Sequence, residues 1–327
     1  MRFPMFPMSS LLRASVVAGL LLSAAGAPAA ADDDGGFTIK DPRIKESSGL
    51  AASRAHPGIY WTHNDSADGP YVYAVDSRTG ETVATITMTG IGRPRDAEAI
   101  SIGTDGNIYL GDIGDNLGGA WDHVWIYEFP EPAVLKDATV RATQYVVKYA
   151  DGPRDAESLM VHPKTGRIYI ASKKEGGGGL YEGPARLSTS GTNVFRRIDE
   201  VPWVTDGAFS PDGTKLALRG YYWAAEYDWT NGKLGARHAV EAPLMRQAES
   251  VTYTLDGKAL LFGSEGESSP VARVPVVTGA GANSPSGKGS SSSDGGGFRN
   301  GNLVYGALVF AGATALWLGG RRLLRRK

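Results

Sequence analysis

The chain has 327 residues, of which 42% are hydrophobic and 21% are charged, which is enough for one large or two small globular domains. It contains no cysteine, so a disulfide scaffold, a cysteine-ligated zinc site and a thiol enzyme are excluded. All 35 acidic residues but only 27 of the 34 basic residues lie at positions 32–300, so this middle part carries a net charge of −8. An acidic body argues against a nucleic-acid partner, which needs a basic surface, and is compatible with cation binding.

Residues 1–31 have the pattern of a secretory signal peptide. Arg2 and Arg13 give a positive start, and the apolar run at 14–26 is too short to span a bilayer. The small residues APAAA before Asp32 suit a cleavage site. We therefore expect an exported chain that begins near residue 32, with an uncleaved anchor as the alternative.

The body, residues 32–277, contains five related segments. Each has a short β-like stretch, a tight turn and further β-rich runs. The first stretches are KESSGLAAS (45–53), RDAEAISIG (95–103), RDAESLMVH (154–162), VTDGAFSPD (204–212) and RQAESVTYT (246–254). The positions Ser48, Glu98, Glu157, Gly207 and Glu249 align, with steps of 50, 59, 50 and 42 residues. Four-stranded units of about forty to fifty residues are typical of β-propeller blades.

The fifth segment has only three β-rich runs, and the stretch 37–50 can supply the missing strand from the N-terminal side. Such a strand would close the ring and hide the sheet edges that an open arc would expose. The sequence thus predicts an all-β protein, a β-propeller of five four-stranded blades closed by the N-terminal strand. A six-bladed ring, with a further blade between Glu98 and Glu157, is the alternative.

Several motifs together resemble bacterial exported β-propellers. The turns SPDG and TLDG are similar to those of WD40-like and lactonase-like repeats, although the true WD dipeptide is absent. The combination of HNDS (63–66), GDIGDN (111–116) and two copies of RDAE resembles surface-anchored actinobacterial propeller proteins, sometimes labelled phytase-like or esterase-like. The resemblance implies a propeller outside the cell and carries over no catalytic residue.

The unusual loops of the body fall at one end of the predicted ring. In an antiparallel blade, the second-to-third loops and the links between blades share one face, while the other two turns share the opposite face. The first set contains 63–70, 111–123, 172–179, 219–223 and 263–269, which are rich in acidic, aromatic and glycine residues. Function concentrates in such loops, so we expect the site on this face.

Acidic residues at the start of the inner strands predict a cation site near the ring axis. Glu98, Glu157 and Glu249 share one aligned position, and converging carboxylates repel each other unless a cation or a basic ligand lies between them. Oxygen-only ligands favour calcium over zinc. The predicted metal ligands are Asp96, Asp112, Asp115, Asn116 and Asp155. The alternative is a set of carboxylates that accept bonds from water and backbone N–H groups.

For catalysis, Glu98, Glu157 and Glu249 are candidate acid/base residues. His63 and Asp65 form a second candidate pair, although a surface histidine that bonds a loop carbonyl is the favoured interpretation of His63. The sequence has no G-x-S-x-G, H-E-x-x-H or P-loop motif.

Basic and aromatic residues on the same face predict ligand contacts. The candidates are Lys173, Arg219, Tyr221 and Trp223. Aromatic rings beside charged groups are found on carbohydrate-binding and protein-binding surfaces, and the alternative is packing between blades.

The C-terminal part predicts a tether and an anchor. Residues 278–301 are rich in glycine and serine and read as a flexible stalk. Residues 302–320 contain an uncharged apolar run, long enough as a helix of roughly 27 Å to cross a bilayer. The basic tail 321–327 is expected to stay in the cytoplasm by the positive-inside rule.

Two functions fit these features. The favoured hypothesis is a membrane-anchored extracytoplasmic binding module for a cell-surface polysaccharide, peptide or protein, supported by the stalk, the anchor and the lack of a nucleophile motif. The alternative is a calcium-dependent hydrolase of a phosphoester, lactone or glycoside, supported by the axial carboxylates and GDIGDN. Fold alone does not decide between them.

Overall fold

The computed structural model describes residues 35–65 and 68–276, all within one compact unit, Met1–Val277. The expected signal peptide at 1–31, the stalk at 278–301, the membrane helix at 302–320 and the basic tail lie outside the described residues. Within the described residues, no helix is long and apolar enough to cross a membrane. The all-β prediction is confirmed, because every regular element there is a strand.

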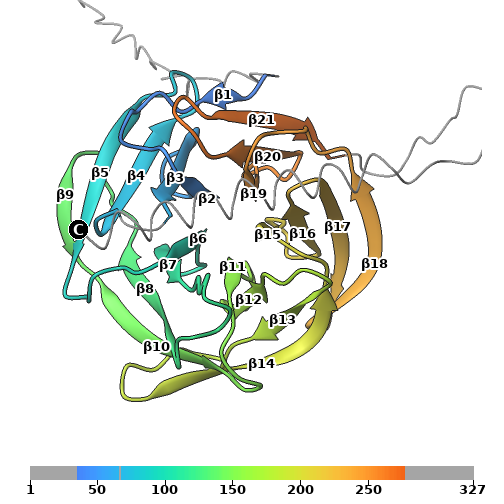
Figure 1. The fold of residues 1–327 in the computed structure, drawn as a ribbon. Coiled ribbons are helices and arrows are strands. Elements are labelled where there is room, and N and C mark those ends of the chain that lie inside the picture. The colour runs from blue at the N-terminus through green and yellow to red at the C-terminus, as the bar shows by residue number, and fades with distance from the viewer. Residues whose placement is uncertain (1–34, 66–67, 277–327) are drawn as a thin grey trace, which may run out of the picture. The chain divides into compact units, whose positions relative to one another are not determined.

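The strands form five successive groups around a central axis, in a propeller-like arrangement (Figure 1). The inner strands are β2 (Ser47–Ala52), β6 (Ala97–Ile102), β11 (Ala156–Val161), β15 (Asp206–Phe209) and β19 (Ala248–Tyr253). The second strands are β3 (Ile59–Asn64), β7 (Asn107–Asp112), β12 (Ile168–Ser172), β16 (Lys215–Gly220) and β20 (Ala259–Ser264). The third strands are β4 (Tyr71–Asp76), β8 (Val124–Pro130), β13 (Gly178–Glu182), β17 (Trp223–Thr230) and β21 (Pro270–Pro275). The outer strands are β5 (Thr82–Thr89), β10 (Thr143–Tyr149), β14 (Thr192–Val201), β18 (Lys233–Val240) and β1 (Phe37–Thr38).

The inner strands neighbour one another in a closed circuit, from β2 through β6, β11 and β15 to β19 and back to β2. The apolar side chains of each group pack against the next group. One such core joins Trp61 of the first group to Tyr127 of the second, and another joins Tyr181 of the third group to Val147 of the second. These side chains are fully buried, which is why the second and third strands read as nearly continuous apolar runs.

The N-terminal strand completes the last group, as predicted. β1 pairs antiparallel with β21, placing Phe37 opposite Val271 and Thr38 opposite Pro270. The next residue, Ile39, is buried and donates its backbone N–H to the carbonyl of Ser269 at 2.9 Å. The two ends of the described chain therefore share one sheet, which covers part of an edge that would otherwise be free.

The long step between Glu98 and Glu157 contains an additional strand. β9 (Ala138–Arg141) leaves its own group and pairs parallel with β5, so the first sheet has five strands. β10 then pairs parallel with β14, which joins the second and third groups into one eight-stranded sheet. Among the described residues of this step there is no sixth strand group; the extra length bridges neighbouring groups at the periphery.

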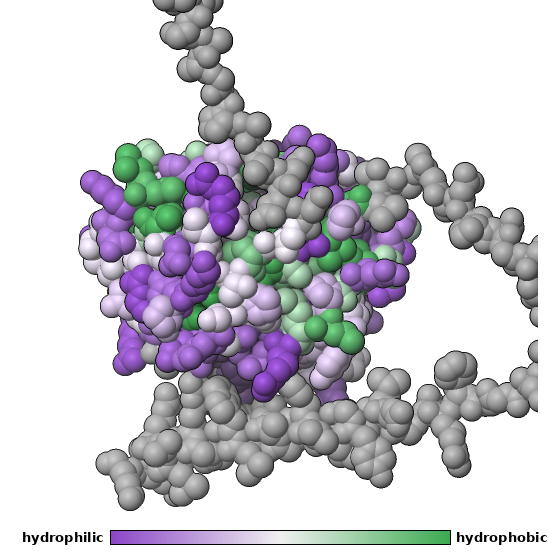
Figure 2. All heavy atoms as spheres, turned by 90° about the horizontal axis from the view of Figure 1, so that it is seen from above, coloured by the Kyte–Doolittle hydropathy of each residue, from purple (hydrophilic) through white to green (hydrophobic). Residues whose placement is uncertain are grey.

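The axis has two different ends, because all five inner strands run in the same direction along it. We call the end where they begin the acidic end, marked by Asp96, Glu98 and Glu157. We call the other end the turn end, where Asp-Gly turns follow the inner strands and Gly106 and Gly213 adopt φ values of 76° and 70°. On the side shown in Figure 2, hydrophilic residues surround small hydrophobic groups, so the coloured surface has no broad apolar patch there.

Candidate functional site

The aligned position lies at a register shift in four of the five groups, and in three of these four it is a glutamate. The register of β6 and β7 shifts between Ala97 and Ala99, and that of β11 and β12 shifts between Ala156 and Ser158. The same shift occurs around Ser48 and Glu249, whereas Gly207 pairs regularly with Leu218. A bulge leaves one residue out of the ladder and re-aims its side chain. The repeated bulge therefore turns Glu98, Glu157 and Glu249 out of the ladder at the acidic end.

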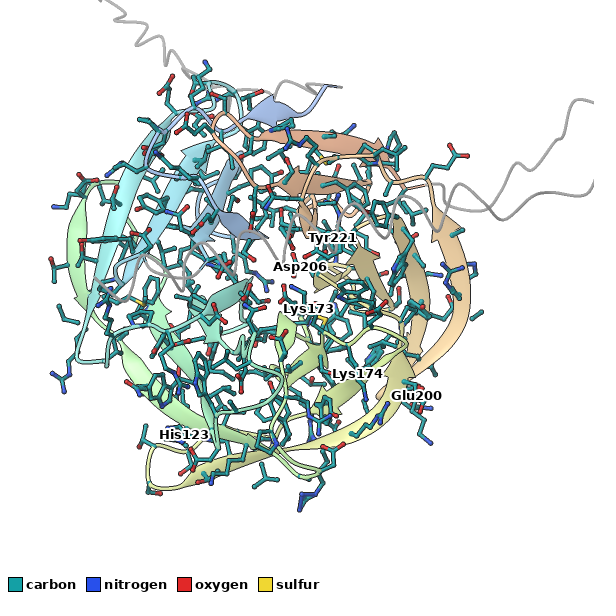
Figure 3. The ribbon with its side chains drawn as sticks, in the orientation of Figure 1. His123, Lys173, Lys174, Glu200, Asp206 and Tyr221 are labelled. Atoms are coloured by element: carbon teal, nitrogen blue, oxygen red, sulfur yellow. The ribbon has the colours of Figure 1, made fainter. Side chains whose placement is uncertain are left out.

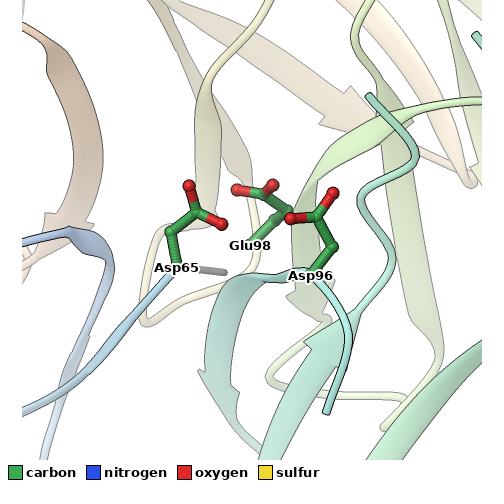
Figure 4. Close-up of side chains that lie close together, drawn as sticks. All are labelled: Asp65, Asp96 and Glu98. Carbon is green, nitrogen blue, oxygen red and sulfur yellow. The ribbon is translucent and has the colours of Figure 1, made fainter. Parts of the chain in front are cut away.

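Three carboxylates meet at this end of the axis. Asp65, Asp96 and Glu98 each offer an oxygen within 4.8 Å of the other two, and Figure 4 shows these groups facing one another. We call them the acidic triad. Ser48 donates its hydroxyl to Glu98 Oε2 at 3.2 Å, and Asn116 donates its amide to Asp96 Oδ2 at 3.1 Å. The triad thus combines the first strand group, through Asp65, with the second, and neighbouring polar side chains hold it in place.

A glycine of the GDIGDN loop makes room for the triad. Gly114 donates its N–H to the Asp96 carbonyl at 3.1 Å. A Cβ at this position would lie 2.6 Å from Glu98 Oε1 and 2.7 Å from Asp96 Oδ2, closer than real Cβ contacts. The loop backbone therefore approaches the carboxylates more closely than any residue with a side chain would allow.

Burial makes the negative charge of the triad costly. It raises the pKa of Asp96 to about 6, although a hydrogen bond with Asp65 acts in the opposite direction. Burial, followed by the charge of Glu157, raises the pKa of Glu98 well above its usual range. Without a cation, Asp96 and Glu98 therefore keep their protons to higher pH than exposed carboxyls do. Carboxylate and amide oxygens are the ligands of hard cations such as Ca²⁺, so the donor set fits such an ion.

Next to the triad is a second buried group, which we call the lysine cluster: Glu157, Lys173 and Tyr221. Lys173 Nζ lies 2.7 Å from Glu157 Oε1 and 5.8 Å from the centre of the Tyr221 ring. The Lys173 side chain is 19% exposed and that of Glu157 only 1%. Figure 3 places Lys173, Tyr221 and Asp206 near the axis, while His123 and Glu200 lie at the periphery.

The lysine cluster has its own electrostatic balance. Burial raises the pKa of Glu157 to about 7, although the charge of Lys173 opposes this rise. Burial disfavours the ammonium of Lys173, but the neighbouring acidic groups, Glu157 first among them, together outweigh burial and hold the pKa of Lys173 well above its usual range. Glu249, the third aligned glutamate, is buried, and its Oε2 has no hydrogen-bond partner among the described residues. The acidic end therefore has more acceptors than donors.

Only part of the predicted metal set reaches the triad. Asp96 belongs to it and Asn116 contacts it, but Asp112 is turned to the backbone and accepts the N–H groups of Arg95 and Asp96 at 3.0 and 2.8 Å. Asp115 accepts the N–H of Trp121, and Asp155 accepts that of Asp115. These three aspartates brace the loop, as the alternative reading expected.

Asp65 belongs to the acidic triad, although the sequence predicted it as an acid/base residue and not as a metal ligand. It follows β3 directly and so lies at the same end of the axis as Asp96, which is the signal that a strand-by-strand reading offers. The predicted partner of Asp65, His63, is buried. The Nδ1 of His63 bonds to the carbonyl of Asn64 at 3.0 Å, and the Nε2 of His63 has no hydrogen-bond partner among the described residues. Burial lowers the pKa of His63 to about 4, so the ring is neutral at pH 7. The His63–Asp65 acid/base pair therefore stays a prediction.

The predicted ligand-binding residues have different environments. Arg219 is 1% exposed and donates Nη1 to the carbonyls of Ser250 and Gly263, both at 2.7 Å, so it is a structural residue and its prediction as a ligand contact is wrong. Trp223 donates its indole N–H to the carbonyl of Trp203 at 3.2 Å. Of the aromatic residues at this end, Tyr222 and Trp203 are the exposed ones, at 69% and 38%.

Comparison with known proteins gives likeness in structure alone. No protein-family model matches the chain, and no curated protein matches it in sequence, so the resemblance to actinobacterial surface propellers has no support from a sequence family. A gluconolactonase from Xanthomonas campestris has 13% identity and a TM-score of 0.44, over 73% of this chain and 88% of the other. An aldose sugar dehydrogenase from Streptomyces coelicolor, in its PQQ-bound form, has 9% identity and a TM-score of 0.43, over 72% and 95%. An auxiliary nutrient binding protein from Bacteroides thetaiotaomicron has 10% identity and a TM-score of 0.42, over 70% of this chain and 57% of the other.

Proposed function

We propose that this chain is a calcium-dependent hydrolase with its active site at the acidic end of the axis. The observation that carries the proposal is the acidic triad, in which oxygens of three carboxylates lie within 4.8 Å of one another and Asp96 and Glu98 are buried. Buried charges of one sign are stable only when they are paired, protonated or bound to a metal ion. A divalent cation with oxygen ligands is the partner that fits this donor set best.

In this proposal, each part of the site has a separate task. Asp65, Asp96 and Glu98 hold the cation, and Asn116 orients Asp96. A calcium ion held there would supply Lewis-acid chemistry, polarising a substrate carbonyl or a water molecule. Glu157, positioned by Lys173, is the general acid/base, because its pKa of about 7 suits proton transfer at neutral pH.

The charges at the acidic end favour a neutral substrate. Three cationic side chains at this end are already engaged: Lys173 is paired with Glu157, Arg219 is bonded to backbone carbonyls, and Arg95 lies over the rings of Trp121 and Trp125. A phosphoester would bring further negative charge to the carboxylates of the triad and to Glu249, while Lys173 is already paired with Glu157. We therefore favour a neutral ester, lactone or glycoside over a phosphoester.

The test combines binding and turnover on the full chain. After treatment with EDTA, Ca²⁺, Mg²⁺ or Zn²⁺ is added, and both the melting temperature and the hydrolysis of neutral esters, lactones and aryl glycosides are measured. We expect Ca²⁺ to raise the melting temperature and to restore turnover, because a ligand of the native state stabilises it by mass action. Glu98→Gln and Asp65→Asn should lose both effects. Glu200→Gln, at an exposed peripheral carboxylate, is the matched control and should keep both.

The two measurements separate the two parts of the proposal. No change of melting temperature with any cation would refute the metal site. A calcium-specific rise without hydrolysis of any substrate would refute the hydrolase and leave a calcium-dependent binding site.

A binding module is the second candidate, and the exposed aromatic residues favour it. Trp203 and Tyr221 lie edge to face with ring centres 5.5 Å apart, and Tyr222 is exposed next to them. Such a surface suits stacking with a sugar ring or contact with a peptide of a cell-surface partner. Tyr222→Ala would weaken binding of a surface polysaccharide while leaving the calcium response intact.

We further assign the five strand groups as five blades, and we propose that the domain is displayed outside the cell on a C-terminal membrane anchor. The blade assignment is supported by the circuit of inner strands. The location is supported by the sequence of 1–31, 278–301 and 302–320. Protease added to intact cells should digest an exported propeller, and protection of the full chain would contradict this location.

A further inference from the structure

The turn end of the axis holds a cavity that the proposed function does not use. It has a volume of about 140 Å³ and is lined by the C-terminal parts of all five inner strands. Most of its lining residues are apolar, with Leu50, Ile100, Val161 and Phe209 among them, while Ser101, Thr252 and Thr254 add polar atoms. The sequence indicated only unremarkable turns on this face, because the apolar residues belong to five separate strands that converge only in the folded ring.

One cationic side chain lines this apolar cavity. Arg54 follows β2, is exposed, and donates Nη1 to the carbonyl of Gly103 at 3.5 Å. Among the described residues, no carboxylate forms an ion pair with it, whereas Arg43, Arg78 and Arg154 all have one. A guanidinium next to an apolar cavity is suited to a carboxylate that arrives with an apolar group attached.

The size of the cavity limits the ligand. A volume of 140 Å³ corresponds to roughly five water molecules of the liquid, and an apolar cavity near this size can bind a small apolar molecule. Sites for drug-sized ligands are larger, on the order of 300–1,000 Å³. The space therefore suits a branched group of about four or five carbon atoms.

We propose that the turn end binds a small apolar monocarboxylate, whose hydrocarbon part fills the cavity between Leu50, Ile100 and Phe209 and whose carboxylate pairs with Arg54. The site is independent of the acidic triad, which lies where the inner strands begin. It gives the axis two sites of opposite preference, one for a cation and one for an apolar anion.

The test uses 4-methylpentanoate and two probes that each lack one feature. Isothermal titration of the full chain should show a dissociation constant on the order of 1 mM for 4-methylpentanoate, because so few non-hydrogen atoms support only weak binding. Acetate lacks the apolar part and 4-methylpentanamide lacks the charge, so each should bind at least about tenfold more weakly.

Matched variants locate the ligand. Arg54→Gln should weaken binding of 4-methylpentanoate at least about fivefold, whereas Arg93→Gln, an exposed arginine on the link to β6, should not. Ala208→Leu fills the cavity and should abolish binding while the melting temperature rises normally with Ca²⁺. Glu98→Gln should leave this binding unchanged, so failure of the hydrolase proposal and failure of this one are distinguishable.

Three results would overturn the proposal. These are no detectable binding of 4-methylpentanoate, equal binding of the amide, and unchanged affinity in Arg54→Gln.

Discussion

At the level of single residues, the acidic triad depends on a position that has no side chain. Gly114 has no positive φ, so alanine is compatible with its backbone, but an alanine Cβ would press on Glu98 and Asp96 at 2.6 and 2.7 Å. We expect Gly114→Ala to force the carboxylates apart and to weaken Ca²⁺ binding about tenfold or more. The affinity is measured by calcium titration of the chelated protein.

The control for this substitution is Gly191→Ala. Gly191 also has no positive φ, and a Cβ there would meet no atom within 4 Å. It should leave calcium affinity and melting temperature unchanged. Equal calcium affinity of Gly114→Ala and the natural protein would show that the loop does not confine the triad.

The ion pair of the lysine cluster allows a second residue-level prediction. Lys173→Met leaves the Glu157 carboxylate buried without its partner, which is expected to cost about 3–5 kcal/mol of unfolding free energy. The double variant Glu157→Gln with Lys173→Met removes both charges and should recover part of this loss. Urea unfolding of the two single variants and the double variant gives the coupling energy, and strictly additive losses would contradict a paired role.

At the same scale, the sequence identified residue types better than it identified contacts. The aligned glutamates could be predicted because repeats place equivalent residues at equivalent strand positions. The triad itself could not, because Asp65 reaches Glu98 through the conformation of a loop outside the ladder. Arg219 was predicted as a ligand contact, yet its side chain turns inward to two carbonyls, a choice that depends on packing between groups.

At the level of elements, β1 is short but stabilises the whole last group. β1 pairs with β21, and the ring of its Phe37 stacks on that of Tyr60 with the ring centres 5.6 Å apart. The next residue after β1, Ile39, is only 1% exposed. A chain that begins at residue 40 loses these contacts and should melt several degrees lower. Replacing a buried isoleucine such as Ile39 by alanine alone typically lowers the unfolding free energy by about 2–5 kcal/mol.

Hydrogen exchange shows whether the loss is local. In the shortened chain, amides of β21 should exchange faster than in the full chain, whereas those of β12, which belongs to another sheet, should exchange at the same rate. Leu244→Ala, at a residue that is 85% exposed, is the control and should change the unfolding free energy by less than about 0.5 kcal/mol. An unchanged melting temperature of the shortened chain would show that β1 does not close the group.

The strand pattern of the elements was predictable, whereas their cross-connections were not. Alternating β-rich runs and Asp-Gly turns are local signals, and closure by residues 37–50 followed from the missing strand. The parallel pairing of β9 with β5 has no such signal, because it depends on which sheet edge lies nearby in space. The bulges at Glu98 and Glu157 were likewise invisible, since a bulge is defined only relative to the partner strand.

For the whole molecule, the buried carboxyls make stability depend on pH and on cations. The pKa values of Asp96 and Glu157 are about 6 and 7, above their ordinary values of 3.8 and 4.5. A carboxyl whose pKa is higher in the folded than in the unfolded chain stabilises the fold below the unfolded value, and this stabilisation is lost as the pH rises through the folded value. In EDTA, we therefore expect the melting temperature of the natural chain to fall relative to that of Glu157→Gln between about pH 4 and pH 7, while His63, whose pKa is lowered to about 4, contributes with the opposite sign in both proteins.

Added calcium should reverse this trend, because the ion replaces the protons of the triad. At pH 8, Ca²⁺ is expected to raise the melting temperature more than at pH 5. Asp41 has the opposite sign, since Arg43 holds its pKa at about 2, so its contribution is lost only as the pH falls through the range from about 4 to 2. A difference in melting temperature between the natural chain and Glu157→Gln that stays constant from about pH 4 to pH 7 in EDTA would contradict this account.

The pairing of β1 with β21 also has a consequence for how the chain assembles. The first four groups consist of strands that follow one another closely, so each can form soon after it is synthesised or exported. The last group needs residues from both ends of the unit and must close a long loop, which makes its completion a late and slow step. Until then the protein is an open arc with an unpaired edge at β21, and this arc is the form most prone to pair with another copy of the chain.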